Sequence, residues 1–305
     1  MMKKSEFQQK ISVSCPKIAM LFSEPMTKHT SFRIGGPAEV MAFPKSVDEL
    51  KNLLSFAARA SCNYMILGAG TNVLAPDEGI PGLVICLKDS IDGIECLENN
   101  RIRVFAGVTM TRAAVFAAKQ NLGGLEFAHG IPGTVGGGVY MNAGAYGGEI
   151  SQVCESVDVL TKNGELISYS CADMQFSYRH SRLEKEGGII ISAVFALTER
   201  PEGEIRNQMQ TLMKRRSESQ PFDLPSAGSA FKRPVGGYAA ALIDQAGLKG
   251  FRVGDAAIST KHAGFAVNVG SATAEHVKQL LQQVSDKVYE QTGIRLEPEI
   301  RIWES

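Results

Sequence analysis

The sequence predicts an α+β fold in which helices alternate with short strands, many of them joined as hairpins. Segments with helical spacing of apolar residues are separated by apolar runs that have the length of strands. An Asn-Gly pair at 163–164 lies between two alternating segments, which is typical of a type I′ hairpin turn. Hairpins need no helical crossover, so this pattern favours α+β layers over a doubly wound parallel sheet.

The first half of the chain contains two predicted helices and several short strands. Residues 1–25 are polar and aperiodic, so we expect a variable lead-in there. Ser46 and Glu49 form a capping-box pattern, and apolar residues then recur at helical spacing up to Ala57. The other elements expected here are strands at 64–67, 83–87 and 102–106 and a helix at 111–121.

The second half follows a glycine-rich stretch and changes character near residue 200. Its polar helix at 200–220 carries its few apolar residues on one face, and a new unit begins at Pro221. A long helix begins near Thr273 and ends at Gly293. The other expected elements are a hairpin at 153–168, strands at 188–197, 229–231, 265–269 and 294–303, and a helix from Tyr238.

Composition excludes several classes of protein. Lys+Arg and Asp+Glu number 32 each in 305 residues, which argues against broad binding of nucleic acid or anionic membrane. The N-terminal residues lack the apolar region of a secretory signal, and no apolar run is long enough to span a bilayer. The six cysteines and five histidines show no metal-ligand spacing, so we expect reduced thiols, no metal and a cytoplasmic protein.

The stretch HGIPGTVGGGVYMNAGAYGG, residues 129–148, has eight glycines in twenty positions. Each interior glycine costs roughly 0.5–1 kcal/mol relative to alanine, so we expect neither an ordinary helix nor a strand there. A backbone without side chains lets N–H groups approach a ligand closely, and phosphate oxygens are the usual ligand. A plain series of turns is the alternative.

A second glycine loop, Gly68-Ala69-Gly70-Thr71-Asn72, follows a predicted strand. This placement suits a pyrophosphate cradle in which Thr71 and Asn72 add side-chain donors. The loop is not a dinucleotide fingerprint, because Val73 occupies the place of the third glycine, and it is not a Walker loop. Taken together, the two loops suggest one extended dinucleotide held from two sides.

Six motifs then point to a family. The motifs are TSFRIGGPAEV (30–40), LGAGTNVL (67–74), LEFAHGIPGTVGGGVYMNAGAYGG (125–148), FSYRHS (176–181), AGSAFKRP (227–234) and LEPEIR (296–301). Their order, spacing and residues resemble the UDP-N-acetylenolpyruvoylglucosamine reductase family, from about residue 26 to the C-terminus.

The resemblance implies an FAD-binding fold of the vanillyl-alcohol-oxidase type, with two α+β subdomains and a C-terminal α+β domain for the substrate. We therefore expect a lead-in at 1–29, FAD-binding subdomains at 30–95 and 96–199, and the substrate domain at 200–305. Non-covalent FAD is expected to contact Gly68, Ala69, Gly70, Thr71, Asn72, Val73, Gly130, Ile131, Pro132, Gly133, Thr134, Gly136, Gly137, Asn142, Ala143 and Gly144.

The family reaction implies NADPH as reductant and a UDP-sugar as substrate. Hydride passes from NADPH to the flavin and then to the vinyl carbon C3 of the enolpyruvyl group, while a proton goes to C2. The matched residues are Arg179 for the growing negative charge, Ser229 as proton donor and Glu299 as an assisting group. Without the family, Arg179 is typical of a surface residue and Ser229 of a turn serine.

The terminal strand shows the limit of what the residue pattern alone can predict. Alternation places Glu297 and Glu299 on the same face, and by pattern this is the solvated face of an edge strand. Only the motif selects Glu299. Lys232 lies three residues from Ser229, hence on the opposite face of a strand, so we do not expect it to activate the hydroxyl.

Substrate contacts are expected from Tyr178, Lys232 and Arg233. Many relatives carry asparagine at the position of Arg233, and arginine there either pairs with a substrate phosphate or faces solvent. The short link between Arg179 and Ser229 leaves no room for the tyrosine-bearing insertion of one branch, so the chain resembles the shorter branch. The alternatives are an FAD oxidase of the same fold with a covalent flavin on His129, and a nucleotide-binding module without catalysis.

Overall fold

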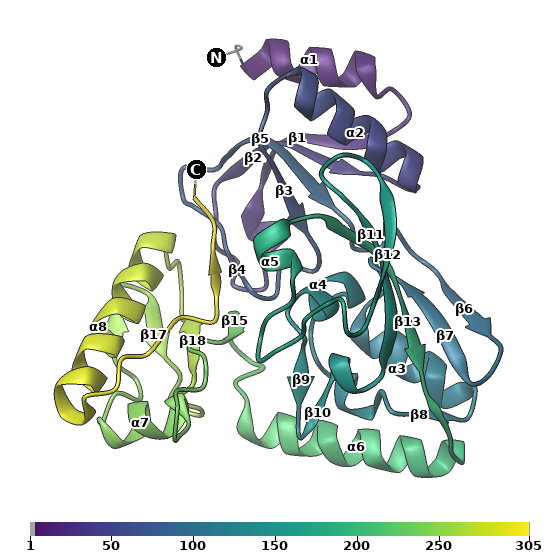
Figure 1. Cartoon of the computed structure of the whole chain (residues 1–305). Coiled ribbons are helices and arrows are strands. Elements are labelled where there is room, and N and C mark those ends of the chain that lie inside the picture. Colours follow the sequence, from purple (N-terminus) through teal and green to yellow (C-terminus); the bar gives the residue numbers. More distant parts are fainter. Residues whose placement is uncertain (1–3, 305) are drawn as a thin grey trace. The chain divides into compact units, whose positions relative to one another are not determined.

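The computed structural model describes residues 4–304, which group into two compact units (Figure 1). The first unit contains residues 4–21, 40–69 and 82–216, and the second contains 22–39, 70–81 and 217–304. Each unit has a hydrophobic core of its own. The division of residues 30–199 into two FAD-binding subdomains stays a prediction.

Helices and short strands alternate along the chain, as the sequence predicts. The α-helices are α1 (Lys4–Ser14), α2 (Val47–Arg59), α3 (Met110–Lys119), α4 (Val135–Tyr140), α5 (Leu183–Glu186), α6 (Glu202–Ser219), α7 (Ala239–Gln245) and α8 (Ala274–Thr292). Three short 3₁₀ turns are η1 (Met26–Lys28), η2 (Glu126–Ala128) and η3 (Ile150–Gln152).

The larger sheets are mostly antiparallel. One has the order β1-β2-β5-β3, with β3 parallel to β5, and the others have the orders β12-β11-β13-β7-β6 and β15-β18-β17-β16. Their strands are β1 (Ala19–Pro25), β2 (Pro37–Phe43), β3 (Tyr64–Leu67), β5 (Ile80–Cys86), β6 (Ile94–Leu97), β7 (Arg101–Phe105), β11 (Cys154–Leu160), β12 (Leu166–Ser170), β13 (Ile189–Ala196), β15 (Ser226–Ser229), β16 (Arg252–Val253), β17 (Ala256–Ile258) and β18 (Phe265–Asn268).

Three two-stranded pairs complete the sheet structure of the described residues. They are β9 (Gly144–Ala145) with β10 (Gly148–Glu149), β8 (Leu122–Gly123) with β14 (Thr198–Glu199), and β4 (Val73–Leu74) with β19 (Arg301–Ile302). The last pair is parallel, and it joins the first glycine loop to the C-terminal segment within the second unit.

The expectation of an irregular N-terminal segment was wrong. Within residues 4–25 the chain forms α1 and β1, and Figure 1 shows α1 beside α2. Phe7, Ile11 and Cys15 recur every fourth residue and are buried, and the Phe7 ring lies 5.7 Å from the Phe56 ring of α2. The helical period was present in the sequence, but the polar residues between these positions masked it.

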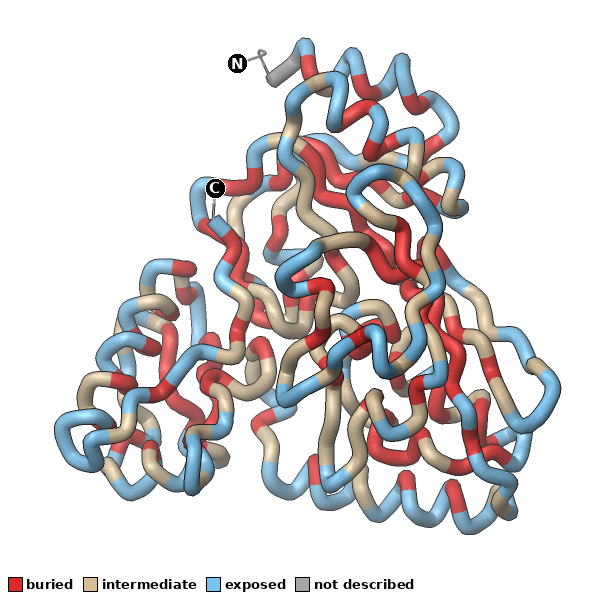
Figure 2. Tube along the Cα trace, viewed as in Figure 1, coloured by how far each residue is buried: buried red, intermediate tan, exposed pale blue. Residues whose placement is uncertain are grey.

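The long helices follow their sequence signals closely. Ser46 and Thr273 cap α2 and α8, each accepting a hydrogen bond from the backbone N–H three residues on. Gly293 ends α8 in the left-handed conformation at φ 71°. Buried residues concentrate along β13 and on one face of α8 (Figure 2). Strand β13 contributes to the core of the first unit and helix α8 to the core of the second.

The hairpin at 153–168 is present, but its turn differs from the prediction. Strands β11 and β12 pair antiparallel, and residues 161–165 connect them. Gly164 has a φ of 81°, whereas Asn163 is not in the positive region that type I′ requires. The N–H of Gly164 donates to the carbonyl of Thr161 at 3.0 Å, so a longer loop replaces the two-residue turn.

The glycine-rich stretch contains a helix that the sequence did not predict. Helix α4 includes Gly136, Gly137 and Gly138, and Thr134 caps it by accepting from the Gly137 N–H. A Cβ on Gly136 would lie 2.9 Å from Ala106 Cβ, and one on Gly138 would lie 2.7 Å from Met110 Sδ. Close packing therefore favours glycine here and outweighs its cost in helix propensity.

The terminal strand is shorter than predicted. Only Arg301 and Ile302 form a strand, and Pro298 makes an isolated bridge with Phe231. Leu296 and Ile300 are buried as the alternation predicts, but Pro298 is exposed. Proline has no N–H to donate, so it interrupts the ladder at this point.

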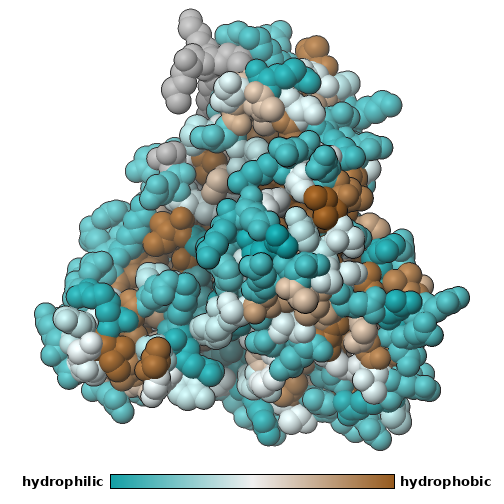
Figure 3. Space-filling view, viewed as in Figure 1, coloured by the Kyte–Doolittle hydropathy of each residue, from teal (hydrophilic) through white to brown (hydrophobic). Residues whose placement is uncertain are grey.

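The surface and the thiols match the composition. On the face drawn in Figure 3, apolar side chains form small separate patches within a hydrophilic surface. The six cysteines form no disulfide in the structure. None of the described helices is long and apolar enough to cross a membrane, and the described residues contain no cluster suited to a metal ion.

Candidate active site

The two glycine loops meet within the first unit. A Cβ on Gly68, at the end of β3, would lie 2.6 Å from the Thr134 hydroxyl oxygen. Thr134 begins α4, so the first loop starts directly against the cap of the glycine helix. The sequence predicts one ligand held by both loops, and their contact here supports that hypothesis.

A tight turn carries Arg179 next to the second loop. Residues Ser177 and His180 close the turn through two backbone hydrogen bonds, and Arg179 has a φ of 55°. Its Nη2 donates to the carbonyl of Gly144 at 3.2 Å, and its Cζ lies 5.2 Å from the Tyr178 ring centroid. A non-glycine residue in this left-handed region is strained, which is common at functional sites.

Asn142 fixes that turn to the second loop. Its amide donates to the carbonyl of Ser177 at 3.1 Å, while its side-chain oxygen accepts from the Ser151 N–H at 2.9 Å. The residue is 1% exposed. The Asn142 side chain is therefore committed to the protein, and the Asn142 N–H also donates to the Val139 carbonyl at 3.1 Å. The structure thus gives Asn142 a role in holding the turn, and its predicted cofactor contact stays a prediction.

Two basic side chains, the half-buried His129 and the buried Arg216, lie near the predicted ligand loops. His129 Nδ1 is buried without a hydrogen-bond partner among the described residues, and burial lowers the pKa of this imidazole. Arg216 of α6 is buried as well, and its Cζ lies 5.3 Å from the Tyr146 ring centroid. A Cβ on Gly130 would lie 3.4 Å from Arg216 Nε, so this cation adjoins the second loop.

In the second unit, the first glycine loop is bonded to the segment that carries Glu299. The Asn72 amide donates to the Glu299 carbonyl at 3.2 Å, and the Arg301 N–H donates to the Asn72 carbonyl at 3.0 Å. The Glu299 N–H in turn donates to the Ala230 carbonyl at 2.9 Å. We call these three contacts the Asn72–Glu299–Ala230 ladder.

Ser229 lies beside this ladder at the end of β15. It pairs with Phe265 of β18 after a register shift, and the preceding Gly228 has a φ of 77°. A Cβ on Gly228 would lie 3.9 Å from the Thr71 carbonyl oxygen. The serine predicted as proton donor and the glutamate predicted to assist it therefore flank residues 70–73 of the first loop.

Ser31 adds a further bond to this arrangement. Its hydroxyl donates to the Ser226 carbonyl at 2.6 Å, and its N–H donates to the Gly70 carbonyl at 3.0 Å. It thus joins β15 to the glycine loop, which gives a physical reason for the TSFRIGG motif. Sequence reasoning missed Ser31, because a lone serine carries no signal of a partner 195 residues away.

The predicted substrate residues in the second unit fall into two pairs. Lys232 Nζ forms an ion pair with Glu297, and their backbones also bond, with the Lys232 N–H donating at 2.8 Å. The Cζ of Arg233 lies 4.5 Å from the centroid of the Tyr238 ring. The sequence analysis did not identify Tyr238 as the partner of Arg233. It also did not predict that Arg216 is buried, because the helix at 200–220 is otherwise polar.

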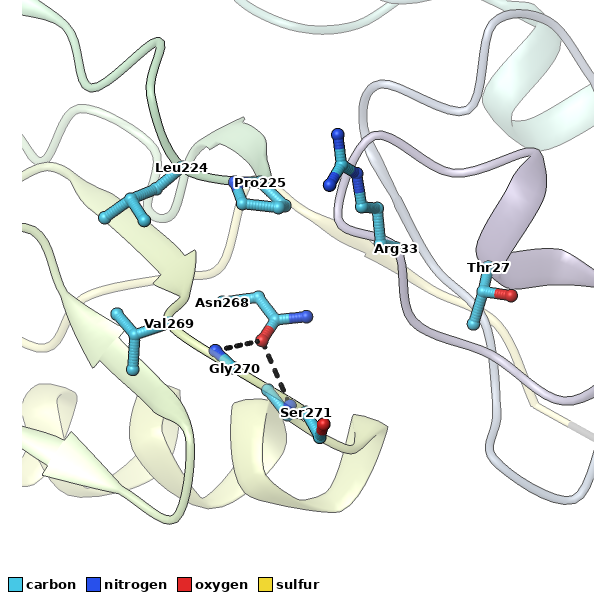
Figure 4. A pocket seen from close by; sticks show the side chains of 9 residues that line it. Thr27, Arg33, Leu224, Pro225, Asn268, Val269, Gly270 and Ser271 are labelled. Carbon is cyan, nitrogen blue, oxygen red and sulfur yellow. Dashed lines mark hydrogen bonds between the residues drawn. The ribbon is translucent and has the colours of Figure 1, made fainter.

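A separate pocket of about 470 Å³ opens in the second unit (Figure 4). Arg33 and Thr27 lie on one side of it, and the backbone of Gly270 lies on the other. None of the residues that line it is among the predicted site residues, so it forms no part of the candidate active site. The lining residues are Thr27, Arg33, Leu224, Pro225, Asn268, Val269, Gly270, Ser271 and Ala272.

The arrangement around the loops fits an anionic dinucleotide. Backbone without side chains at Gly68 and Gly137, a buried guanidinium at Arg216 and a buried imidazole nitrogen at His129 are suitable partners for a pyrophosphate and a polar ring system. Residues 70–73 continue the chain into the second unit, where Asn72 is bonded to the segment that carries Glu299.

Comparisons with known proteins agree with this interpretation. A family model described as an FAD binding domain matches residues 38–170. A second model, described as the C-terminal domain of UDP-N-acetylenolpyruvoylglucosamine reductase, matches residues 220–303.

Relatives of that name match nearly the whole chain. The UDP-N-acetylenolpyruvoylglucosamine reductase of Agathobacter rectalis is 43% identical, covering 97% of this chain and 98% of that protein. The one from Caldanaerobacter subterraneus is 45% identical over 93% of each. The crystal structure of the reductase from Thermus caldophilus is 36% identical and covers 94% of this chain and 99% of its own, with a TM-score of 0.80.

Helix α4 allows packing and cofactor binding to be separated. Gly136→Ala should destabilise the protein by about 1–3 kcal/mol, because the new Cβ meets Ala106 backbone and side chain. Gly137→Ala should fold at least as well as the wild type, since its Cβ would lie at an ordinary 3.6 Å from Thr134 and alanine favours the helix.

The readouts are urea unfolding and the FAD retained per chain after purification. We expect Gly137→Ala to retain less FAD than the wild type despite its stability. A Gly137→Ala protein with a full complement of FAD would show that this face of α4 does not adjoin the cofactor.

Proposed function

The chain belongs to the UDP-N-acetylenolpyruvoylglucosamine reductase family, and we propose that Arg179, Ser229 and Glu299 carry the chemistry of its reaction. It is an FAD-dependent oxidoreductase with the FAD-binding fold of the vanillyl-alcohol-oxidase type. With NADPH as reductant, it reduces UDP-N-acetyl-3-O-(1-carboxyvinyl)-glucosamine to UDP-N-acetylmuramate in peptidoglycan synthesis. Bound FAD supplies the hydride transfer.

The protein's own residues must stabilise charge and deliver a proton. As the vinyl carbon C3 is reduced, negative charge grows on C2 and on the substrate carboxylate, and C2 must then be protonated. We propose that the Arg179 guanidinium pairs with this carboxylate. Its planar, permanently charged fork suits a carboxylate, and its contact with Gly144 and its strained turn support a fixed position.

The Asn72–Glu299–Ala230 ladder carries the proposal for proton delivery. It bonds residue 72 of the flavin-binding loop to the backbone of Glu299 and, through it, to the residue after Ser229. We propose that the Ser229 hydroxyl gives its proton to C2. A serine hydroxyl is a weak acid, so we assign Glu299 the role of assisting this transfer.

Substrate and cofactor contacts complete the proposal. We infer that FAD is held without a covalent bond by the two glycine loops, and that Tyr178, Lys232 and Arg233 contact the UDP-sugar. Lys232 would exchange its ion pair with Glu297 for a substrate phosphate. We further propose that the chain acts in the cytoplasm and has neither nucleic acid nor membrane as a partner, which agrees with its balanced charge.

Stopped-flow measurement without oxygen isolates the role of Ser229. Reduction of the flavin by NADPH needs no proton on carbon, so Ser229→Ala should bleach at close to the wild-type rate. Reoxidation by the enolpyruvyl nucleotide should slow by about 10²-fold or more, which is the usual contribution of a positioned general acid. Ser229→Cys, which still has a proton to donate, should fall between the two.

Two outcomes would contradict this assignment. Normal reoxidation of Ser229→Ala would mean that another group donates the proton. Loss of flavin, or slow bleaching by NADPH, would mean that Ser229 supports the FAD site instead.

Steady-state kinetics test Arg179 and Glu299. Arg179→Ala and Glu299→Ala should lower kcat by about 10-fold or more with a smaller rise in KM, because their interactions strengthen in the transition state. Glu297→Ala is the matched control, because Glu297 lies two residues from Glu299 and its side chain is exposed. This variant should have a far milder effect on kcat. Changes confined to KM would show that Arg179 and Glu299 only bind the substrate.

A further inference from the structure

The pocket of the second unit has a polar side and an apolar side (Figure 4). Arg33 and Thr27 lie on the polar side, and Leu224, Pro225 and Val269 lie on the other. The volume of about 470 Å³ is in the range of small-molecule sites, which is roughly 300–1,000 Å³. The pocket therefore has room for a ligand that combines a polar group with an apolar body.

Arg33 occupies a backbone position that favours glycine. Its N–H donates to the Thr30 carbonyl at 3.0 Å to close a turn, and its φ is 56°. The Thr30 hydroxyl donates to the Ile34 carbonyl at 2.9 Å, so the turn is fixed on both sides of Arg33. A residue with a Cβ is strained in this left-handed region, and such strain is common at functional sites. Backbone stability therefore does not explain an arginine at this position.

The Arg33 side chain is available to a ligand. The residue is exposed, and its guanidinium has no hydrogen bond or ion pair within residues 4–304. Other arginines of the second unit are paired, as Arg252 is with Asp255 at 3.0 Å and Arg295 with Asp286 at 2.9 Å. An anion can therefore bind to Arg33 without displacing a carboxylate of the protein.

Hydrogen bonds of Asn268 hold the two sides of the pocket in place. Its side-chain oxygen accepts from the N–H groups of Gly270 at 3.1 Å and Ala272 at 3.0 Å. Its amide donates to the carbonyl of Phe32, the residue before Arg33, at 3.2 Å. These N–H groups are already bonded, so recognition of a charge depends on Arg33. Little ordering of this framework is needed when a ligand binds.

The turn of Arg33 also holds the strand that carries Ser229. The Ser31 hydroxyl donates to the Ser226 carbonyl at 2.6 Å, and Pro225, which lines the pocket, directly precedes β15. A ligand in the pocket would therefore contact the residues on both sides of this connection.

We propose that the pocket binds a small organic anion, whose phosphate or carboxylate group pairs with the Arg33 guanidinium and whose apolar part packs against Pro225 and Val269. A planar guanidinium forms two parallel hydrogen bonds with either group. Val269 is 38% exposed, so a ligand can bury apolar area there. The site goes beyond the proposed function, because none of its residues is assigned to FAD or to the UDP-sugar.

A titration followed by amide NMR on the FAD-loaded protein tests the site, with phenyl phosphate and benzoate as separate probes. We expect at least one probe to shift the Gly270 and Ser271 resonances saturably, and the tighter probe identifies the preferred group. Arg33→Gly should weaken its binding by about 10-fold or more at an unchanged melting temperature, because glycine suits a φ of 56°. Arg33→Lys keeps the charge without the planar fork and should fall between Arg33→Gly and the wild type.

Two controls separate this site from other modes of binding. Arg295→Ala removes a paired arginine elsewhere in the second unit and should bind the probes like the wild type. Benzyl alcohol, which has the ring without the anion, should bind more weakly than the tighter probe.

Three results would overturn the proposal while leaving the proposed function intact. They are equal affinity of Arg33→Gly and the wild type, shifts confined to the surroundings of Arg233, and no saturable shift with either probe.

Discussion

The Asn72–Glu299–Ala230 ladder is the constraint on which the arrangement of Ser229 and Glu299 in the second unit depends. Asn72 of the first glycine loop uses its backbone carbonyl and its amide to hold the C-terminal segment, and that segment holds the residue next to Ser229. Reaction rates are sensitive to misplacements of about 1 Å. The ladder ties the positions of Ser229 and Glu299 to residues 70–73, and Ser31 holds β15 to Gly70 from the other side.

In the first unit, close packing and a side-chain hydrogen bond fix the glycine helix and the turn of Arg179. The glycine helix packs so closely on Ala106 and Met110 that side chains are excluded, and the adjoining Asn142 uses its amide to hold the turn of Arg179. Several glycines of the stretch thus serve packing, whereas Gly137 remains open. The glycine stretch therefore combines close packing at Gly136 and Gly138 with an open position at Gly137, where we propose that the cofactor binds.

Elements with strong local signals could be predicted from the sequence. The caps of α2 and α8, the buried face of α8 and the strand before Gly68 all follow from spacing and end residues. Helix α4 could not be predicted, because the tertiary packing of Gly136 outweighs weak local propensity. Helix α1 was missed although Phe7 and Ile11 carry a helical period, because polar residues separate them. The motifs identified the family and its candidate catalytic residues. The bonds of Asn72 and Ser31 could not be predicted, since their partners lie about 200 residues away along the chain.

The most direct measurement is anaerobic stopped flow on Asn72→Ala. The Asn72 amide donates to the Glu299 carbonyl, so in this account the side chain holds the Glu299 segment and does not serve as the FAD donor that the sequence predicts. The variant should therefore keep its FAD and be bleached by NADPH at nearly the wild-type rate. Its reoxidation by the enolpyruvyl nucleotide should slow by about 10-fold or more, because Glu299 and Ser229 lose their fixed position. Reoxidation at the wild-type rate would contradict the claim that this ladder positions the proton-delivering residues.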